Sequence, residues 1–311
     1  MKQVLVGDIG GTHSRFALSQ GGGGPHQVRA FDNDEVGSLE AAIGHYLKDT
    51  GAHPTAAVLA IAAPVRGRDI AMTNRGWRFN LDDIKTRFGF GRIRAINDFE
   101  AQAWALTRLG ADDLRRIGRN GDPSDGSKVV LGPGTGLGVA ALLPDAHGLI
   151  VIATEAGHGS FGPAHADEDI VFARLRAAGP VSAETVLSGP GLARLHAALH
   201  PQAPVTDAAA IDRAAHTGEA DACATTDMFA RLLGRFAGDM MLVFRATGGV
   251  YLTGGVAQAL GDRLDAAKFR AAFETHPPYA EMLAQTPTYL ITHSQPGLLG
   301  AAALAGMASA D

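Results

Sequence analysis

The sequence contains a single cysteine, Cys223, among its 311 residues. One cysteine cannot form an internal disulfide, and it excludes every metal or iron–sulfur site that is built from a cluster of cysteines. No apolar run approaches the ~20 residues of a membrane-spanning helix, and the N-terminal apolar run is much shorter than the core of a signal peptide. We therefore expect a cytoplasmic protein without a membrane partner.

Positive charge and the common nucleotide-binding motifs are missing as well. The formal net charge is −5 and the arginines are scattered, whereas nucleic acid is bound by concentrated positive charge, so we expect no nucleic-acid partner. The chain has no GxxxxGK[ST] loop, no HRD catalytic string and no GxGxxG turn with an acidic follower. These absences argue against the P-loop, protein-kinase and dinucleotide-binding classes.

Glycine, in contrast, is abundant: its 40 residues include two similar strings, DIGGT at 8–12 and GPGTG at 132–136. Each string lies between two apolar runs, which predicts a strand, a tight turn and a second strand in both places. Glycine lets the backbone approach a phosphate closely, and the threonine hydroxyl adds a donor. One such string is more typical of a plain hairpin turn, but two of them predict a pair of phosphate-binding turns that need no lysine.

Two further features belong to this pattern. Asp8 ends the first predicted strand, where a carboxylate can hold Mg²⁺ through water when the ion arrives with substrate phosphates. Taken alone, Asp8 is typical of an Asx turn. Gly254 and Gly255 end a strand predicted within 248–257, where a flat ring and a ribose can lie against the backbone. Taken alone, this pair is more typical of a plain strand-to-helix turn.

The order of the segments predicts a mixed α/β protein, and the length exceeds that of a typical single core, so we expect two domains with a cleft between them. Strands are predicted at 3–8, 14–19, 26–31, 56–62, 92–96, 149–153 and 290–292, and helices at 38–49, 80–88, 167–177, 190–199, 224–246, directly after Asp98 and from 296 onward. The helix 224–246 carries an apolar stripe that we assign to the core: Phe229, Leu232, Leu233, Phe236, Met240, Val243 and Phe244.

The three glycine strings follow the order of the phosphate 1, phosphate 2 and adenosine segments of the sugar kinase, actin and heat-shock ATPase superfamily. Longer strings, among them VGDIGGTHSRFAL, MTNRGW, INDFEAQA, EAGH and VSAETVLSGPGL, resemble those of the bacterial ATP-dependent glucokinases over nearly the whole chain. The resemblance implies a two-lobed actin-like (ribonuclease H-like) α/β ATPase fold. It places a small domain over 1–108, joined by the C-terminal helix 296–311, and a large domain over 109–295.

The same resemblance implies ATP-dependent phosphorylation of glucose to glucose 6-phosphate, the first step of glucose use in glycolysis, with Mg²⁺ as cofactor and a homodimer as the assembly. Phosphoryl transfer to a hydroxyl needs in-line positioning, charge neutralisation and a carboxylate that takes the proton. The resemblance assigns that carboxylate to Asp98, which follows a predicted strand and begins a helix. Without the resemblance, Asp98 is more typical of a helix N-cap.

Sugar hydroxyls need several buried donors and acceptors. The resemblance assigns this role to Asn97, Asp98, Glu155, His158 and Glu184, with Asn74 as a further candidate. The residues alone leave other interpretations open. Glu155 and His158 have the spacing of metal ligands, although no third ligand is evident nearby, and they could equally form an exposed pair. Glu184 suits either the acid of a capping box or a charge in the first turn of a helix. The predicted nucleotide contacts are Asp8, Gly10, Gly11, Thr12, Gly134, Thr135, Gly136, Gly254 and Gly255.

Three positions depart from the family pattern. His13 stands where asparagine is usual, Ala156 replaces a glycine, and Pro133 removes one N–H donor from the second glycine string.

Two alternatives to a glucokinase stay open: a kinase for another hexose or an amino sugar, and a non-catalytic sugar-sensing regulator of the same fold. A single cysteine cannot supply the cysteine-rich zinc motif of the related repressor and kinase family, which disfavours that family. We also expect no DNA-binding helix pair before the first strand, which disfavours the regulator.

Overall fold

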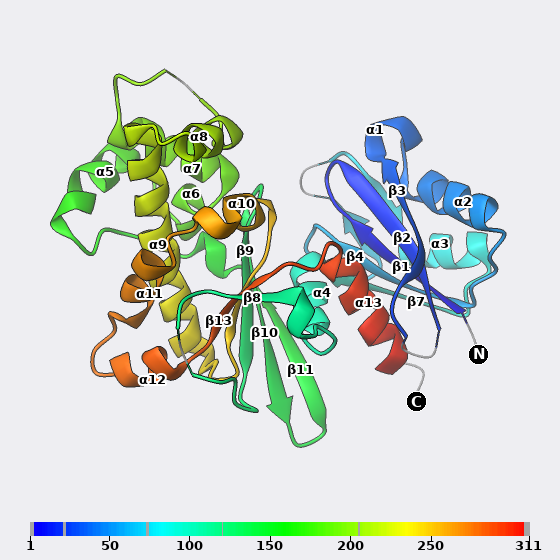
Figure 1. The fold of residues 1–311 in the computed structure, drawn as a ribbon. Helices are drawn as coiled ribbons and strands as arrows, with labels where there is room; N and C mark the ends of the chain where they lie inside the picture. Colours follow the sequence, from blue (N-terminus) through cyan, green and yellow to red (C-terminus); the bar gives the residue numbers. More distant parts are fainter. Residues whose placement is uncertain (1–2, 21–22, 73–74, 120, 205, 308–311) are drawn as a thin grey trace. The chain divides into compact units, whose positions relative to one another are not determined.

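The computed structural model describes residues 3–20, 23–72, 75–119, 121–204 and 206–307. The chain forms two compact units (Figure 1). Unit 1 consists of residues 1–110 together with 293–311, and unit 2 consists of residues 111–292. The chain therefore leaves unit 1, builds unit 2 and then returns to complete unit 1.

Unit 1 is an α/β unit. Its strands are β1 (Gln3–Ile9), β2 (His13–Gln20), β3 (His26–Asp32), β4 (Ala56–Ile61), β5 (Asp69–Ala71), β6 (Arg78–Asn80) and β7 (Arg92–Asn97). Its helices are α1 (Asn33–Val36), α2 (Leu39–Thr50), α3 (Leu81–Phe88), α4 (Asp98–Ala105) and α13 (Pro296–Met307).

The main sheet of unit 1 has the strand order β3-β2-β1-β4-β7, and β5 and β6 pair separately. The strands β1, β2 and β3 are antiparallel neighbours, whereas β4 and β7 run parallel to β1. In the parallel register Ile9 pairs with Ile61, and Ile61 pairs with Asn97. The end of β1, with Asp8, therefore reaches the same sheet edge as the start of α4.

Helices cover both faces of this sheet (Figure 1). The helices α2 and α3 pack on one face through a buried cluster that includes Phe16, Ile43 and Ile84. The helices α4 and α13 contact the strands of the other face and each other. They approach so closely that a Cβ at Gly300 would collide with the carbonyl oxygen of Ala101.

Unit 2 is also an α/β unit. Its strands are β8 (Leu114–Arg116), β9 (Lys128–Pro133), β10 (Leu137–Asp145), β11 (Gly148–Thr154), β12 (Val250–Leu252) and β13 (Thr288–Ile291). Its α-helices are α5 (Ala166–Arg176), α6 (Ala183–Val186), α7 (Gly189–Leu199), α8 (Ala208–His216), α9 (Ala220–Phe244), α10 (Gly255–Leu260), α11 (Ala266–Glu274) and α12 (Ala280–Gln285). Short 3-10 turns lie at Ala111–Asp113, Ala156–His158 and Gly261–Arg263.

The sheet of unit 2 repeats the topology of unit 1. Its order is β11-β10-β9-β12-β13-β8, with β9, β10 and β11 antiparallel and with β12 and β13 parallel to β9. The additional strand β8 pairs antiparallel with β13 at the far edge. In both units the first hairpin of the sheet carries a glycine string, at β1–β2 and at β9–β10.

The long helix α9 (yellow in Figure 1) supplies much of the core of unit 2. The predicted stripe is buried at Phe229, Leu232, Leu233, Phe236 and Met240, and Phe244 packs against the same cluster. The assignment of Val243 to the core is wrong, since this residue is 68% exposed. The helix ends one residue later, so the stripe reaches the surface in its last turn.

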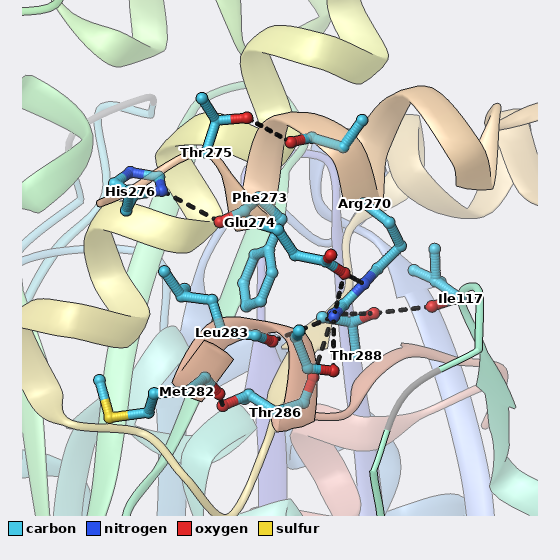
Figure 2. Close-up of polar contacts among 12 residues, drawn as sticks. Ile117, Arg270, Phe273, Glu274, Thr275, His276, Met282, Leu283, Thr286 and Thr288 are labelled. Atoms are coloured by element: carbon cyan, nitrogen blue, oxygen red, sulfur yellow. Dashed lines mark hydrogen bonds and ion pairs between the residues drawn. The ribbon is translucent and has the colours of Figure 1, made fainter. Parts of the chain in front are cut away.

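A buried arginine of α11 forms hydrogen bonds with α12, with β13 and with the segment between them in unit 2 (Figure 2). Arg270 of α11 donates to the carbonyl oxygens of Leu283 and Thr286, both at 3.0 Å, and to the Thr288 hydroxyl at 3.3 Å. Its charge is paired with Glu274 one turn further on, at 2.6 Å. Burial lowers the pKa of Arg270, and Glu274 partly offsets this effect.

The predicted strands and helices all occur near their expected ranges, except that the segment 248–257 is a strand only over Val250–Leu252. The sequence did not predict α1, β5, β6, β8, α6, α8, α11 and α12, most of which are short. Among the described residues, no helix has the length and apolar character needed to cross a membrane.

Candidate active site

The candidate site residues of unit 1 begin with the first glycine turn, which joins β1 to β2. The Gly10 N–H donates to the His13 carbonyl oxygen at 3.0 Å, which closes the turn. The N–H groups of Gly11 and Thr12 have no acceptor among the residues that the structure describes. The turn therefore offers two backbone donors and the exposed Thr12 side chain to an anion.

Asp8 lies beside this turn, opposite Arg15 in the hairpin register. Burial raises the pKa of Asp8, and the charge of Arg15 lowers it. Within the described ranges no hydrogen bond reaches its carboxylate, and a Cβ on Gly297 of α13 would lie 2.7 Å from Oδ2. A carboxylate with its space kept open and no donor of its own fits a hydrated cation.

Asn97 and Asp98 join β7 to α4 and have separate roles. Asn97 is the N-cap: its Oδ1 accepts from the Phe99 N–H at 2.9 Å, and its Nδ2 donates to the Ala63 carbonyl oxygen at 3.3 Å. The alternative that Asp98 is the N-cap is therefore wrong, because Asp98 is the first residue inside the helix. One oxygen of Asp98 accepts from the Phe99 N–H at 3.0 Å.

The Asp98 carboxyl has an unusual affinity for a proton. Burial first, and then the nearby charge of Asp8, raise its pKa to about 6 from the ordinary 3.8, while the Phe99 N–H acts in the opposite direction. A carboxylate with this pKa is still ionised near neutral pH, and it holds a proton more tightly than an ordinary aspartate. These surroundings make the Asp98 carboxylate a stronger base than an ordinary aspartate.

In unit 2, the second glycine turn joins β9 to β10 and is tied to Glu184. The Glu184 Oε2 accepts from the Leu137 N–H at 2.8 Å, and a Cβ on Gly136 would lie 2.6 Å from the same oxygen. The capping box of α6 is formed by Ser182 and Thr185, so the interpretation of Glu184 as a capping-box acid is wrong. Glu184 does lie in the first turn of α6, as the other alternative held.

The third glycine string meets the second in unit 2. The strands β9 and β12 are parallel neighbours, and Gly254, with a φ of 88°, lies so near Pro133 that a Cβ would be 2.6 Å from its carbonyl oxygen. The Gly189 N–H, at the start of α7, donates to the Gly134 carbonyl oxygen at 2.7 Å. The turn at Gly134–Gly136 and the start of α10 at Gly255 are therefore neighbours.

The sugar-binding candidates of unit 2 form one group. The His158 Nε2 lies 4.0 Å from Glu155 Oε2, and its Nδ1 lies 4.0 Å from Glu184 Oε1. These distances exceed hydrogen-bonding range, and the side chains are 63%, 71% and 31% exposed for His158, Glu155 and Glu184. The described residues hold no group of three His, Cys, Asp or Glu side chains suited to a metal ion. The group offers donors and acceptors to a ligand from solvent.

The remaining predicted positions have different outcomes. Asn74 lies outside the residues that the structure describes. Ala156, at a family glycine position, lies in a 3-10 turn and packs against the core, so this replacement costs no special backbone conformation. The sequence analysis missed Asn33, which contacts the first glycine turn, because no motif marks it.

Comparisons with known proteins place these features in a family. The glucokinase family model matches residues 5–308. A glucokinase from Chelativorans sp. (strain BNC1) is 42% identical over 97% of this chain and 91% of its own length. The bifunctional protein glk of Burkholderia lata is 39% identical over 96% of this chain, which spans only 48% of that longer protein.

Solved structures agree with the fold. The crystal structure of a glucokinase from an Antarctic psychrotroph has a TM-score of 0.89 and 34% identity, covering 98% of both chains. A ROK family glucokinase from Streptomyces griseus in complex with glucose and AMPPNP has a TM-score of 0.65 and 21% identity, covering 97% of this chain and 98% of its own. The predicted actin-like α/β fold is confirmed. This chain belongs to the glucokinase family.

Proposed function

We propose that this chain transfers the γ-phosphoryl group of ATP to glucose, forming glucose 6-phosphate, and that Asp98 is the general base. The proposal rests mainly on the raised pKa of the Asp98 carboxyl, which burial and the charge of Asp8 bring to about 6. Asn97 caps the helix, so Asp98 is not needed as its N-cap. The family match over nearly the whole chain supports the reaction class.

The proposed reaction forms one bond to the γ-phosphorus and breaks another. The glucose 6-hydroxyl oxygen attacks the γ-phosphorus, its proton passes to Asp98, and the bond to the bridging oxygen breaks to release ADP. In a loose transition state the proton leaves late, so a base of this strength is sufficient. We propose that the sugar hydroxyls are bound by Asn97, Asp98, Glu155, His158 and Glu184, with Asn74 as a further candidate.

The nucleotide is assigned to backbone groups. We propose that Gly10, Gly11 and Thr12 in unit 1 and Gly134, Thr135 and Gly136 in unit 2 bind the phosphates, and that Gly254 and Gly255 lie against the adenosine. A ROK family glucokinase with a similar fold was solved in complex with glucose and the ATP analogue AMPPNP, which supports this pair of substrates. Mg²⁺, when bound with ATP, neutralises charge on the phosphates, and Asp8 is proposed to hold it through water.

The test is ADP release with Mg-ATP and a panel of glucose, mannose, fructose, galactose, N-acetylglucosamine and no sugar. Asp98→Ala should lower kcat for glucose by roughly 10²–10⁴. Glucose binding measured by calorimetry should stay largely intact, because the other sugar-binding candidates remain. Glu100→Ala, which removes another carboxylate from the first turn of α4, is the matched control and should retain wild-type turnover.

Each outcome of this test is informative. Near-normal turnover by Asp98→Ala would remove Asp98 from its role. Preference for another sugar would identify a kinase for another hexose or an amino sugar, and sugar binding without ADP release would identify a non-catalytic regulator. We further propose a homodimer, which sedimentation analysis tests, and the cytoplasm, where ATP is available, as the location.

A further inference from the structure

Asn33 is a fully buried asparagine whose side chain contacts the first glycine turn. We propose that Asn33 is a positioning residue that holds this turn so that the N–H groups of Gly11 and Thr12 face a nucleotide phosphate. The inference rests on the proposed function, because it assumes that the turn binds the phosphates of ATP. It assigns a role to a residue outside every motif of the chain.

One residue satisfies the carbonyl groups of the whole turn. The Asn33 Nδ2 donates to the carbonyl oxygens of Gly10 at 2.9 Å and Gly11 at 3.2 Å, and the Asn33 backbone N–H donates to the Thr12 carbonyl oxygen at 2.9 Å. The Ser14 hydroxyl donates to Asn33 Oδ1 at 2.7 Å. Because Oδ1 is already engaged by a donor, the NH₂ side of the amide is the side that faces the turn.

Peptide geometry connects these contacts to phosphate binding. In a planar trans peptide, the C=O of one residue and the N–H of the next point in opposite directions. When Asn33 binds the carbonyl oxygens of Gly10 and Gly11, it therefore directs the N–H groups of Gly11 and Thr12 away from itself. These are the two N–H groups that find no acceptor among the described residues.

The side-chain amide of Asn33 does not cap the helix that begins at this residue. The short helix α1 begins at Asn33, but its N-cap is Asp32, whose Oδ1 accepts from the Asp34 N–H at 2.8 Å. Arg75 contacts the turn as well, donating to the Gly11 carbonyl oxygen at 3.1 Å, and its charge is paired with Asp34 at 2.6 Å. Two side chains thus pull the same peptide unit in one direction, which favours a pre-organised anion site.

The test uses Asn33→Asp in the full chain, which keeps the size of the side chain but removes both donors to the turn. Calorimetry should show Mg-ADP binding weakened about 10-fold or more, and KM for ATP should rise similarly. Glucose affinity without nucleotide should change by less than about 2-fold, a split that general damage to unit 1 would not give. Asp32→Ala, which removes the neighbouring helix cap, is the matched control and should bind Mg-ADP as the wild type does.

Ser14→Ala provides the second, milder variant, because it frees the amide to rotate without placing a charge in the core. It should weaken Mg-ADP binding in the same direction by a smaller factor. Wild-type Mg-ADP affinity in Asn33→Asp, or in Ser14→Ala if Asn33→Asp does not fold, would overturn the inference. Equal losses in Asn33→Asp and Asp32→Ala would also overturn it, as would a wild-type chain that does not bind Mg-ADP.

The binding experiment separates this inference from the proposed function. A chain that binds Mg-ADP in an Asn33-dependent way but transfers no phosphoryl group to glucose would refute the proposed function and support the role of Asn33. If the wild-type chain phosphorylates glucose but the Asn33→Asp variant binds Mg-ADP with wild-type affinity, the proposed function is supported and the role of Asn33 is refuted.

Discussion

Asn97 and Asp98 show how two adjacent residues divide two tasks that aspartate often performs alone. The amide of Asn97 caps α4, and the Asp98 carboxylate, inside the first turn, accepts from the Phe99 N–H at 3.0 Å. Burial and the charge of Asp8 then raise the pKa of Asp98 to about 6. The surroundings of the carboxylate, more than its identity, make it suitable for accepting a proton.

The raised pKa predicts an acid limb in the rate. Below pH 6 Asp98 becomes protonated, so kcat/KM for glucose should fall about 10-fold per pH unit and reach a plateau above pH 7. An aspartate with an ordinary pKa would place this limb near pH 4. The rate is to be measured below saturation in both glucose and Mg-ATP, where it reports the ligand-free protein, with circular dichroism at each pH to detect acid unfolding.

Direct titration of the ligand-free protein provides the control. Carbon-13 carboxyl signals of labelled aspartate, assigned with Asp98→Asn, should show Asp98 titrating near pH 6. In Asp8→Asn the pKa of Asp98 should fall, because a like charge is removed. An Asp98 signal that titrates near pH 4 in the wild type would contradict the prediction.

At the scale of elements, the contact between α4 and α13 sets the position of the residues around Asp98. Gly300 of α13 lies directly over the backbone of α4, where a Cβ would collide with the Ala101 carbonyl oxygen. Gly297 of the same helix leaves space for the Asp8 carboxylate. The helix at residues 296–307 therefore packs against the elements that carry Asp8 and Asp98, which lie in the first third of the sequence.

A pair of glycine substitutions tests this contact. Gly300→Ala should lower the free energy of unfolding by about 1–3 kcal/mol, because the added methyl group forces two packed helices apart. Gly44→Ala, in the middle of α2, meets only Phe88 Cε1 at 3.9 Å and should stabilise the protein by about 0.5–1 kcal/mol through helix propensity. Urea unfolding of both variants measures the difference, and equal effects at the two positions would contradict the close packing.

The sequence could predict those parts of the molecule that depend on local patterns. Both glycine hairpins and the long helix with its buried Phe229 follow from apolar periodicity and turn residues. The short helices α8, α11 and α12 were not predicted, because a short segment contains too few helical turns to show a clear apolar periodicity. The roles of Asn33 and Glu184 could not be predicted in detail, since each depends on a contact with a turn that lies 22 or more residues away.

At the scale of the whole molecule, one topology occurs twice in a single chain, and unit 1 is discontinuous in sequence. Unit 2 is continuous over 111–292, whereas unit 1 needs α13 from beyond unit 2. Among the described residues, one buried cluster lies wholly in unit 1 and another lies wholly in unit 2, and we expect that one unit can lose its structure while the other keeps it.

A charge placed in α13 tests this separation in the full chain. Leu304→Asp, at a side chain that is 3% exposed, should destabilise unit 1 by about 3 kcal/mol or more, because a carboxylate is buried without a partner. Hydrogen exchange measured by mass spectrometry should show faster exchange in β1, β4 and α4 and unchanged protection in β9 and α9. Met307→Asp, at a 39% exposed position of the same helix, is the control. Equal loss of protection in both units would show a single cooperative structure.

The return of α13 to unit 1 also has a consequence during synthesis. When the ribosome has made β1, β4 and β7, the helix that covers one face of their sheet does not yet exist, and residues 111–292 must be translated first. At elongation speeds of about 5–20 residues per second this interval lasts roughly 10–40 s. Throughout it the part of the sheet that α13 covers lacks its helix, so the unit that carries Asp98 is the first to be translated and the last to be completed.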